Sequence, residues 1–507
     1  MINRRSFIHR ASRAALGAAV YPMLQNTGLG ETAPNGKPWN VLFIIIDDHG
    51  PNLHSVLQDS KVHTPNMERI AARGTWFTHG YVASPGCCPS RTAFLTGVHT
   101  SRSGVYHNNQ AYRRTGTWIS EVQNLPQHFM RNGYLSAGYG KICHNRFVED
   151  EIDAYTPGYY KMFNIPEDVT HTESGLMEHI IPGTEIEIPD GPENYTWGVL
   201  PDEWDRDEPA KWQQDTQQAS RTIALLEDDH DKPFFAACGF WKPHVRWTVA
   251  QRYYARYPIE SIEIPEGYRG DDLEDMPAPA RWRATYRGIH DKIVRNGLWK
   301  KAIQAFYASI TYVDEQIGRV LDALEASPHN DNTIVVFAAD NGWHTGEKNH
   351  WSKFILTELA CKVTFSISVP GMPSQVVHTP VGLLDIYPTL VNLCGLPQPP
   401  THSLDGRDLT PILEGKTKDR GAPVVSTQGV NCHSVRDARF RYTHYRNSDE
   451  QLYDHERDPH EWRNLASDAR FDSVKTRLAQ WLPKENAPNA PYDTGERGHG
   501  AWDPSVM

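Results

Sequence analysis

The stretch that decides the fold is NVLFIII, residues 40–46, which is followed directly by Asp47 and Asp48. A continuous, largely β-branched apolar run of this kind is typical of a strand buried on both faces of a sheet. The abrupt change to two carboxylates marks the carboxyl end of that strand. Because the ligands of parallel sheets gather at the carboxyl ends of their strands, we expect a functional site at this point.

Further strand-like runs and helical segments alternate along the next 350 residues. One helix is predicted with particular clarity, because its apolar residues recur at intervals of three and four and form a single stripe: Ile303, Phe306, Ile310, Val313, Ile317, Val320 and Leu324. Strands are predicted at residues 134–139, 233–238, 333–337 and 363–369. This alternation predicts an α/β fold in which a large, mainly parallel sheet lies between helices, and it places Asp340 and Asn341 at a second strand end.

Two regions depart from this pattern, and the chain changes character near its end. Residues 145–212 and 258–299 are rich in Pro, Gly and acids with weak periodicity, so we expect long insertions that wall a binding site. Beyond the Pro-rich stretch at 396–400, short alternating runs and a last helical segment predict a small antiparallel sheet plus a helix: runs at 424–427, 439–445 and 451–453, and a helix at 468–482. The predicted catalytic domain is therefore 37–400 and the C-terminal subdomain 401–507.

The N-terminus and the overall charge bear on location and partners. Arg4 and Arg5, followed by Ser6-Phe7 and a mildly apolar stretch at 14–24, resemble a twin-arginine export signal. Residues 1–36 are therefore predicted to be an export signal and linker, and the protein to be periplasmic or secreted. No apolar segment reaches the ~20 residues that span a bilayer, so we expect no membrane span. The formal charge of −11, without a basic run, argues against nucleic-acid binding.

Seven cysteines are too few and too widely spaced for a disulfide framework, and their spacing does not fit a structural zinc site. The adjacent pair Cys87 and Cys88 stands apart, because Pro89 suits the first turn of a helix. That helix would begin at the two cysteines and direct free backbone N–H groups toward an anion. We therefore expect an anion-binding site there.

The segment CCPSRTAFLTG, residues 87–97, resembles the signature of the type I, formylglycine-dependent sulfatases of the alkaline-phosphatase-like superfamily. The resemblance implies that a formylglycine-generating or sulfatase-maturating enzyme oxidises Cys87 to formylglycine, while Cys88 occupies the variable position. It implies that Arg91 supports this group. It also implies that a calcium ion is held by four hard oxygen ligands: Asp47, Asp48, Asp340 and Asn341.

The remaining motifs look most like the iduronate-2-sulfatase-related branch of this family. The resemblance implies that Lys141 lowers the pKa of the attacking hydroxyl, that His144 orients it and takes its proton, and that His244 and Lys353 hold sulfate and protonate the leaving oxygen. The motifs that carry these residues are GKICH at 140–144, KPH at 242–244 and WSK at 351–353, and stretches 451–454 and 458–461 resemble the family's C-terminal domain.

Several other residues could have either a functional or a structural role. Trp343 and His344 directly follow the second metal pair, and either line the substrate pocket or pack in the core. Asp314 lies inside the periodic helix and is predicted to be a helix-surface residue or part of a packing network. Three histidines outside the motifs are expected to be structural: His63, His79 and His128.

The predicted function is hydrolysis of the sulfuric ester of a sulfated carbohydrate. A net negative chain repels a polyanion, so attraction must come from local cations, which favours a recessed pocket and exo-action on an oligosaccharide. Two alternatives remain open at this point. One is a phosphodiester or phosphonate hydrolase with the same formylglycine site. The other is a non-catalytic sulfated-glycan-binding protein in which Cys87 stays unmodified.

Overall fold

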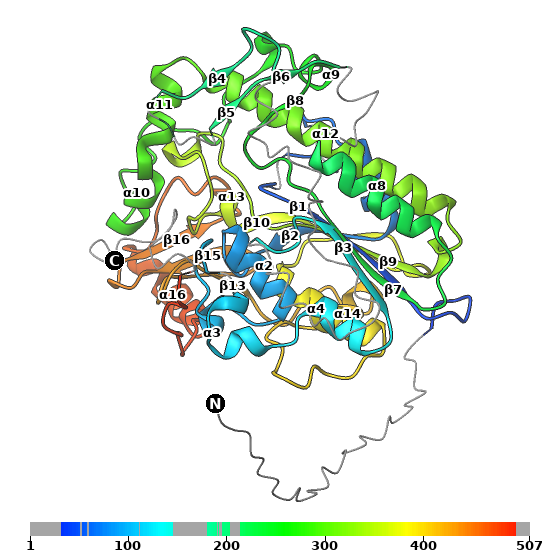
Figure 1. The fold of residues 1–507 in the computed structure, drawn as a ribbon. Helices are drawn as coiled ribbons and strands as arrows, with labels where there is room; N and C mark the ends of the chain where they lie inside the picture. Colours follow the sequence, from blue (N-terminus) through cyan, green and yellow to red (C-terminus); the bar gives the residue numbers. More distant parts are fainter. Residues whose placement is uncertain are drawn as a thin grey trace, which may run out of the picture.

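The computed structural model describes residues 32–50, 53–57, 60–110, 112–144, 180–189, 191, 195–202 and 213–492. The predicted export signal and most of the insertion at 145–212 lie outside these residues. Figure 1 shows the described chain as a central sheet with helices on both faces and a smaller sheet beside it.

The central sheet has the strand order β11-β2-β10-β9-β1-β7-β3, and β12 pairs with β2. The quoted run 40–46 forms β1, which is fully buried and parallel to both neighbours, so that Ile44 faces Cys238 on one side and Phe337 on the other. The strand bounds are β1 Asn40–Ile46, β2 Thr75–Tyr81, β3 Leu135–Gly140, β7 Phe234–Gly239, β9 Thr333–Ala339, β10 Lys362–Ser368, β11 Gln375–Val377 and β12 Val381–Gly382.

The predicted α/β fold is confirmed, with one difference in strand direction. Strand β10 runs antiparallel to both β2 and β9, whereas the other pairings of the sheet are parallel. The sheet is therefore mixed. An apolar run shows that a strand is buried but not which way it points, since that depends on how the preceding loop returns to the sheet.

Helices cover the two faces of this sheet (Figure 1). On one face, α12 packs along α8 and α1, and its predicted apolar stripe is buried. On the other lie α2, α4 and α14. The helix bounds are α1 Pro65–Arg73, α2 Cys87–Thr96, α4 Leu125–Arg131, α8 Gln214–Glu227, α12 Trp299–Ala326 and α14 Ile386–Leu393. Within the described ranges, no helix combines the length and apolar character needed to cross a bilayer.

Asp314, buried in α12, accepts hydrogen bonds from the backbone N–H groups of Asn66 and Met67 at 3.1 and 2.9 Å and so joins α1 to α12. The region 258–299, expected to be an irregular insertion, instead carries two short helices: α10 Ala278–Ala284 and α11 Ile289–Arg295. Their length leaves too few turns for a clear apolar period in the sequence.

The C-terminal part is an antiparallel sheet of four strands with a helix, as predicted in kind (Figure 1). The run β14 was not predicted, because three of its four residues are polar although all four are buried. The last helix is shorter than expected and follows a 3-10 turn at 469–471. The bounds are β13 Val424–Thr427, β14 His433–Arg436, β15 Phe440–His444, β16 Glu450–Asp454 and α16 Asp472–Ala479.

A buried carboxylate joins this small sheet to the central one. Glu358 accepts hydrogen bonds from the Tyr81 hydroxyl at 2.7 Å, from Arg436 Nε at 3.2 Å and from Arg441 Nη2. Burial alone would raise the pKa of Glu358, but Arg436, His455 and Arg441 hold it well below its usual range. Glu358 therefore links strand β2 of the central sheet to strands β14 and β15 of the small sheet.

Candidate active site

The site forms where three elements meet. Strands β1 and β9 are parallel neighbours, so the residues after their carboxyl ends, Asp47-Asp48 and Asp340-Asn341, lie at one edge of the sheet. Helix α2 begins at Cys87, with Gly86 as its extended N-cap, and aims its first turn at this edge. All of these site residues are buried. The sequence-predicted acids, amide and cysteine are therefore brought together.

Cys87 and Cys88 point in different directions. Cys87 Sγ lies 3.4 Å from Asp47 Oδ1 and 2.7 Å from Lys353 Nζ. The Cys88 thiol instead donates to the Gln110 carbonyl at 3.3 Å and packs with Val98. Burial, and then the charge of Asp47, raise the pKa of the Cys87 thiol well above its usual range. An unmodified thiol here stays protonated, which makes it a poor nucleophile.

Arg91 lies one turn along α2 from Cys87 and bridges two of the acids. Its Nε donates to Asp340 Oδ2 at 2.6 Å and its Nη2 to Asp47 Oδ2 at 3.3 Å, while Nη1 donates to the Lys141 carbonyl. The ammonium of Lys141 pairs with Asp47 and lies 4.0 Å from the centre of the Trp241 ring. Although burial alone would raise the pKa of Asp47, these cations and Lys353 hold it well below its usual value.

Asp48 and Asn341 leave oxygen atoms without partners. Asn341 Nδ2 donates to Asp48 Oδ1 at 2.6 Å, and Lys353 pairs with the same oxygen. Among the described residues, Asp48 Oδ2 and Asn341 Oδ1 are buried without a hydrogen-bond partner. Burial raises the pKa of Asp48 to about 8, with Lys353 opposing the rise and Asp47 and Asp340 adding to it.

This donor set fits a hard divalent cation. One ligand atom from each of Asp47, Asp48, Asp340 and Cys87 lies within 4.8 Å of all the others. Carboxylate and amide oxygens are the ligands that Ca²⁺ and Mg²⁺ prefer, and crowded buried carboxylates gain most from such an ion. The two unpartnered oxygens of Asp48 and Asn341 are the atoms that it would satisfy.

His244 approaches the acids from the loop after β7. Its Nε2 lies 3.8 Å from Asp48 Oδ2, and its Nδ1 hydrogen-bonds the Val245 carbonyl at 2.5 Å. Burial, together with Lys141 and Lys353, lowers the pKa of His244 well below its usual value, so the ring is neutral. With Nδ1 carrying the hydrogen of that bond, Nε2 presents its lone pair toward the site.

One positioning residue was missed by the sequence analysis. Asp215, at the start of α8, accepts the backbone N–H groups of Trp241 at 2.6 Å and Lys242 at 2.8 Å. These two bonds fix the loop that carries His244. An acid in the first turn of a helix is common in sequences, and no local signal distinguishes this one, because its partners lie 26 and 27 residues along the chain.

The remaining predicted residues are His144, Trp343 and His344, and the ring centre of Trp343 lies 5.7 Å from Lys353 Nζ. His144 is half-buried on the loop that follows Lys141, at the edge of a described range, and its role stays a prediction. Trp343 is buried and packs against Tyr195 and Trp247. Both ring nitrogens of His344 are engaged, by the Ser352 carbonyl at 3.3 Å and the Thr357 hydroxyl at 3.1 Å. The geometry thus gives Trp343 and His344 packing contacts, and a role in substrate binding also stays a prediction.

Comparison with known proteins agrees with this geometry. The family model described as "Sulfatase" matches residues 39–396, and the model "N-sulphoglucosamine sulphohydrolase, C-terminal" matches residues 346–487. A protein named "Sulfatase" from Formosa agariphila is 34% identical over 460 residues, which cover 89% of this chain and 87% of that one. The iduronate 2-sulfatase of Mus musculus is 28% identical, over 74% of this chain and 72% of its own.

Solved structures share the fold at lower identity. A 2-O GAG sulfatase superimposes with a TM-score of 0.66 at 22% identity, covering 88% of this chain and 91% of its own. The phosphonate monoester hydrolase of Agrobacterium radiobacter gives a TM-score of 0.67 at 22% identity, over 87% and 94%. The family match spans more than half of the chain and includes the whole cluster around Cys87. The chain belongs to the type I sulfatase family of the alkaline-phosphatase-like superfamily and is a sulfuric ester hydrolase.

Proposed function

We propose that the protein removes sulfate from a sulfated carbohydrate, by exo-action on an oligosaccharide derived from a polysaccharide. The observation that carries the proposal is the position of Cys87 Sγ, between Lys353 Nζ at 2.7 Å and Asp47 Oδ1 at 3.4 Å in a buried cluster of cations and acids. The carbohydrate class is supported by the names of relatives, among them iduronate 2-sulfatase and a Δ4,5-hexuronate-2-O-sulfatase of Bacteroides thetaiotaomicron.

The attacking group of this proposal comes from Cys87. Formylglycine, formed from Cys87 by a formylglycine-generating or sulfatase-maturating enzyme, supplies in hydrated form the oxygen that attacks sulfur. Lys353, at 2.7 Å from the side-chain atom of residue 87, is proposed to favour ionisation of a hydroxyl there, against the opposing effects of burial and of Asp47. Asp47, which faces the same atom, fixes its direction.

A calcium ion is the second proposed component. Asp47, Asp48, Asp340 and Asn341 would hold it, and it would offset negative charge on the transferring sulfate. Arg91 orients two of these ligands, because its buried guanidinium group donates to Asp340 Oδ2 at 2.6 Å and to Asp47 Oδ2 at 3.3 Å. The oxygen atoms of Asp48 and Asn341 that lack partners among the described residues support the assignment.

Breaking the ester bond requires a proton for the departing sugar hydroxyl. His244 and Lys353 are proposed to hold sulfate and to supply this proton, since both contact Asp48 from different loops. The neutral state of His244 calls for it to take up a proton when sulfate binds. His144 is proposed to accept the proton of the second hydroxyl when sulfate is later expelled.

The burial of the site supports a recessed pocket. Cys87, Arg91, Lys141 and Lys353 are each less than a tenth exposed, so a sulfate reaches them only if its sugar enters end-on. Attraction comes from these local cations against a net charge of −11. We expect slow release of sulfate from intact polymer until another enzyme shortens the chain.

The location of the protein is part of the proposal. The Arg4-Arg5 segment, which resembles a twin-arginine signal, supports export to the periplasm or the medium. This export route carries chains that are already folded. Conversion of Cys87 would then take place before export, in the cytoplasm.

The test is expression with and without a maturating enzyme, followed by two measurements. The mass of the tryptic peptide that contains Cys87 should show the aldehyde only in the first preparation, and sulfate release should follow it. Rates on an aryl sulfate and an aryl phosphodiester should favour the sulfate. A faster phosphodiester reaction would favour the phosphonate-hydrolase function, and an unmodified Cys87 with glycan binding but no turnover would favour a binding protein.

A further inference from the structure

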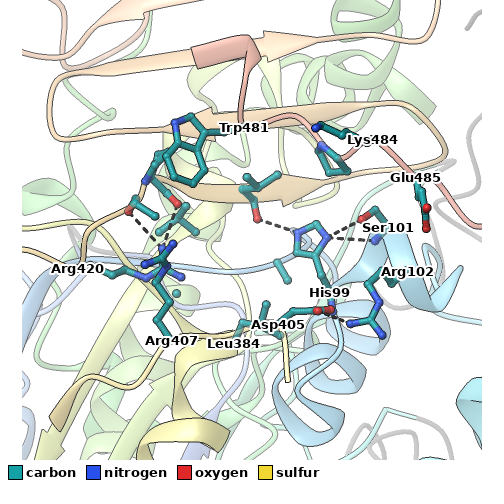
Figure 2. A pocket seen from close by; sticks show the side chains of 17 residues that line it. His99, Ser101, Arg102, Leu384, Asp405, Arg407, Arg420, Trp481, Lys484 and Glu485 are labelled. Atoms are coloured by element: carbon teal, nitrogen blue, oxygen red, sulfur yellow. Dashed lines mark hydrogen bonds and ion pairs between the residues drawn. The ribbon is translucent and has the colours of Figure 1, made fainter. Parts of the chain in front are cut away.

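A second cavity lies outside the active site, between the catalytic domain and the last segment of the chain (Figure 2). It encloses about 360 Å³, a size within the range of small-molecule sites. Its floor is apolar and comes from three separate regions, with Ala83 before α2, Leu384 before α14, and Pro423 and Val424 at the start of β13. The sequence gives none of these positions a role in binding, although Val424 begins a predicted strand.

Two of the arginines that line the cavity are already neutralised. Arg420 donates to both oxygens of the buried Asp385, at 2.6 and 2.7 Å, and Arg102 pairs with Asp405. The backbone N–H of His99 donates to Asp405 at 2.8 Å as well. These ion pairs stabilise the wall of the cavity, and they leave Arg420 and Arg102 with little net charge to attract a ligand.

Two other cations remain available. Arg407 and Lys484 are exposed and line the cavity, and neither side chain contacts an acid within the part of the chain that the structure describes. Figure 2 labels Lys484 and the exposed acid Glu485 side by side at the right, away from Arg407 and Trp481. The end of the cavity that holds Arg407 and Trp481 therefore carries the positive charge of Arg407, and Lys484 lies across the cavity from it.

Trp481 adds an aromatic surface at this positive end. It follows α16, its backbone N–H donates to the Leu478 carbonyl at 3.0 Å, and its side chain is 41% exposed although tryptophan usually packs inside. Figure 2 shows the indole above Arg420 and Arg407. An exposed indole in a cavity that also has an exposed guanidinium and an exposed ammonium in its lining matches a sugar that carries an anionic group, because the apolar face of the ring stacks while the anion pairs with a cation.

We propose that this cavity is a non-catalytic subsite for an acidic sugar, bearing sulfate or carboxylate, of the glycan on which the enzyme acts. The inference rests on the proposed function for the class of ligand. Ala83 lines the cavity and stands only four residues before Cys87, so these two residues are at most about 14 Å apart, the length of the extended backbone between them. The subsite would hold a glycan near the active site and raise the effective concentration of its terminal sugar there.

The experiment uses the Cys87→Ala chain, which binds without turnover. Isothermal titration would follow decasaccharides prepared from heparan sulfate, chondroitin sulfate and ulvan, each also in a chemically desulfated form, with inorganic sulfate as the anion alone. Trp481→Ala and the double change Arg407→Ala/Lys484→Ala remove the stacking surface and the cations. Arg295→Ala/Lys300→Ala is the matched control, because both residues are exposed cations, on α11 and α12.

We expect at least one sulfated decasaccharide to bind, with its affinity reduced about fivefold by Trp481→Ala and about tenfold by the double change. The control should bind as the parent does, and the thermal midpoints should agree because the changed residues are exposed. The proposal is wrong if no sulfated decasaccharide binds, or if neither subsite variant weakens the binding of any that does. It is also wrong if inorganic sulfate binds as tightly as the sulfated decasaccharides do. Sulfate release by the mature enzyme is measured separately, so failure here leaves the proposed function standing.

Discussion

The adjacent cysteines allow a decisive prediction, because one residue serves as the control for the other. Replacing Cys87 with Ala removes the side chain that lies 2.7 Å from Lys353 Nζ, and with it the attacking oxygen of the proposed reaction. Loss of a covalent nucleophile lowers kcat by about 10⁴-fold or more. Replacing Cys88 with Ala removes a buried thiol that donates to the Gln110 carbonyl and packs outside the site. Its cost is about 1 kcal/mol of stability, with kcat within about threefold of the parent.

The assay is sulfate release from an aryl sulfate by each mature variant, with urea unfolding to measure stability. We expect Cys87→Ala to unfold like the parent and to be inactive, and Cys88→Ala to be active and slightly less stable. Peptide masses should show the aldehyde at Cys87 in the Cys88→Ala chain. The reasoning is refuted if Cys88→Ala is as inactive as Cys87→Ala while remaining folded, or if the aldehyde is found on Cys88.

Three further predictions concern charged groups: the proposed metal ligands, Lys353 beside Cys87, and Glu358 at the junction of the two sheets. Chelation should abolish activity and calcium should restore it, with Asp340→Asn losing both the bound ion and turnover; stoichiometric zinc without calcium in active enzyme would contradict this. Lys353→Met should lower kcat by about 10²–10³-fold, because a buried cation at the reacting atom is lost, and a kcat within threefold would exclude that role. Glu358→Gln should cost about 3–5 kcal/mol in urea unfolding at neutral pH, whereas Glu414→Gln, in which a half-buried carboxylate loses its pair with the exposed Lys416, should cost under about 1 kcal/mol. Because the pKa of Glu358 is lowered in the folded protein, the ionised side chain contributes its full stabilisation above the usual pKa of 4.5 and progressively less as the pH falls below it. The difference in unfolding free energy between the parent and Glu358→Gln should therefore become smaller in acid. A difference that does not change with pH, down to the lowest pH at which the protein stays folded, would refute the charge argument.

The strands and the acids could be predicted because their signal is local. A run such as NVLFIII can be satisfied only by burial on both faces, and the carboxylates after it mark the strand end. The direction of β10 could not be predicted, since it depends on the path of the chain between β9 and β10. Strand β14 was missed because His433, Ser434 and Arg436 are buried by partners on other segments. From the sequence alone, polar residues of this kind are expected to lie on the surface.

The site residues also fall into those that could be predicted from the sequence and those that could not. Cys87, Arg91 and the acids lie within motifs or at strand ends, so their meeting could be predicted from topology. Asp215 could not, because its function depends on a loop that returns to it from the other end of α8. The packing of Trp343 against Tyr195 and Trp247 likewise depends on a segment whose sequence has weak periodicity. The sequence shows which groups do chemistry better than it shows which groups hold them in place.

The ion-paired junction at Glu358 limits how the chain can be recombined with its relatives. A gene fragment ending near residue 400 would lack Arg436 and Arg441, so the carboxylate of Glu358 would keep the Tyr81 hydroxyl as a partner but lose both arginines. A chimera that grafts another sulfatase's C-terminal part would need to bring arginines at both positions. The border between the two parts is therefore a poor place to cut for modular engineering.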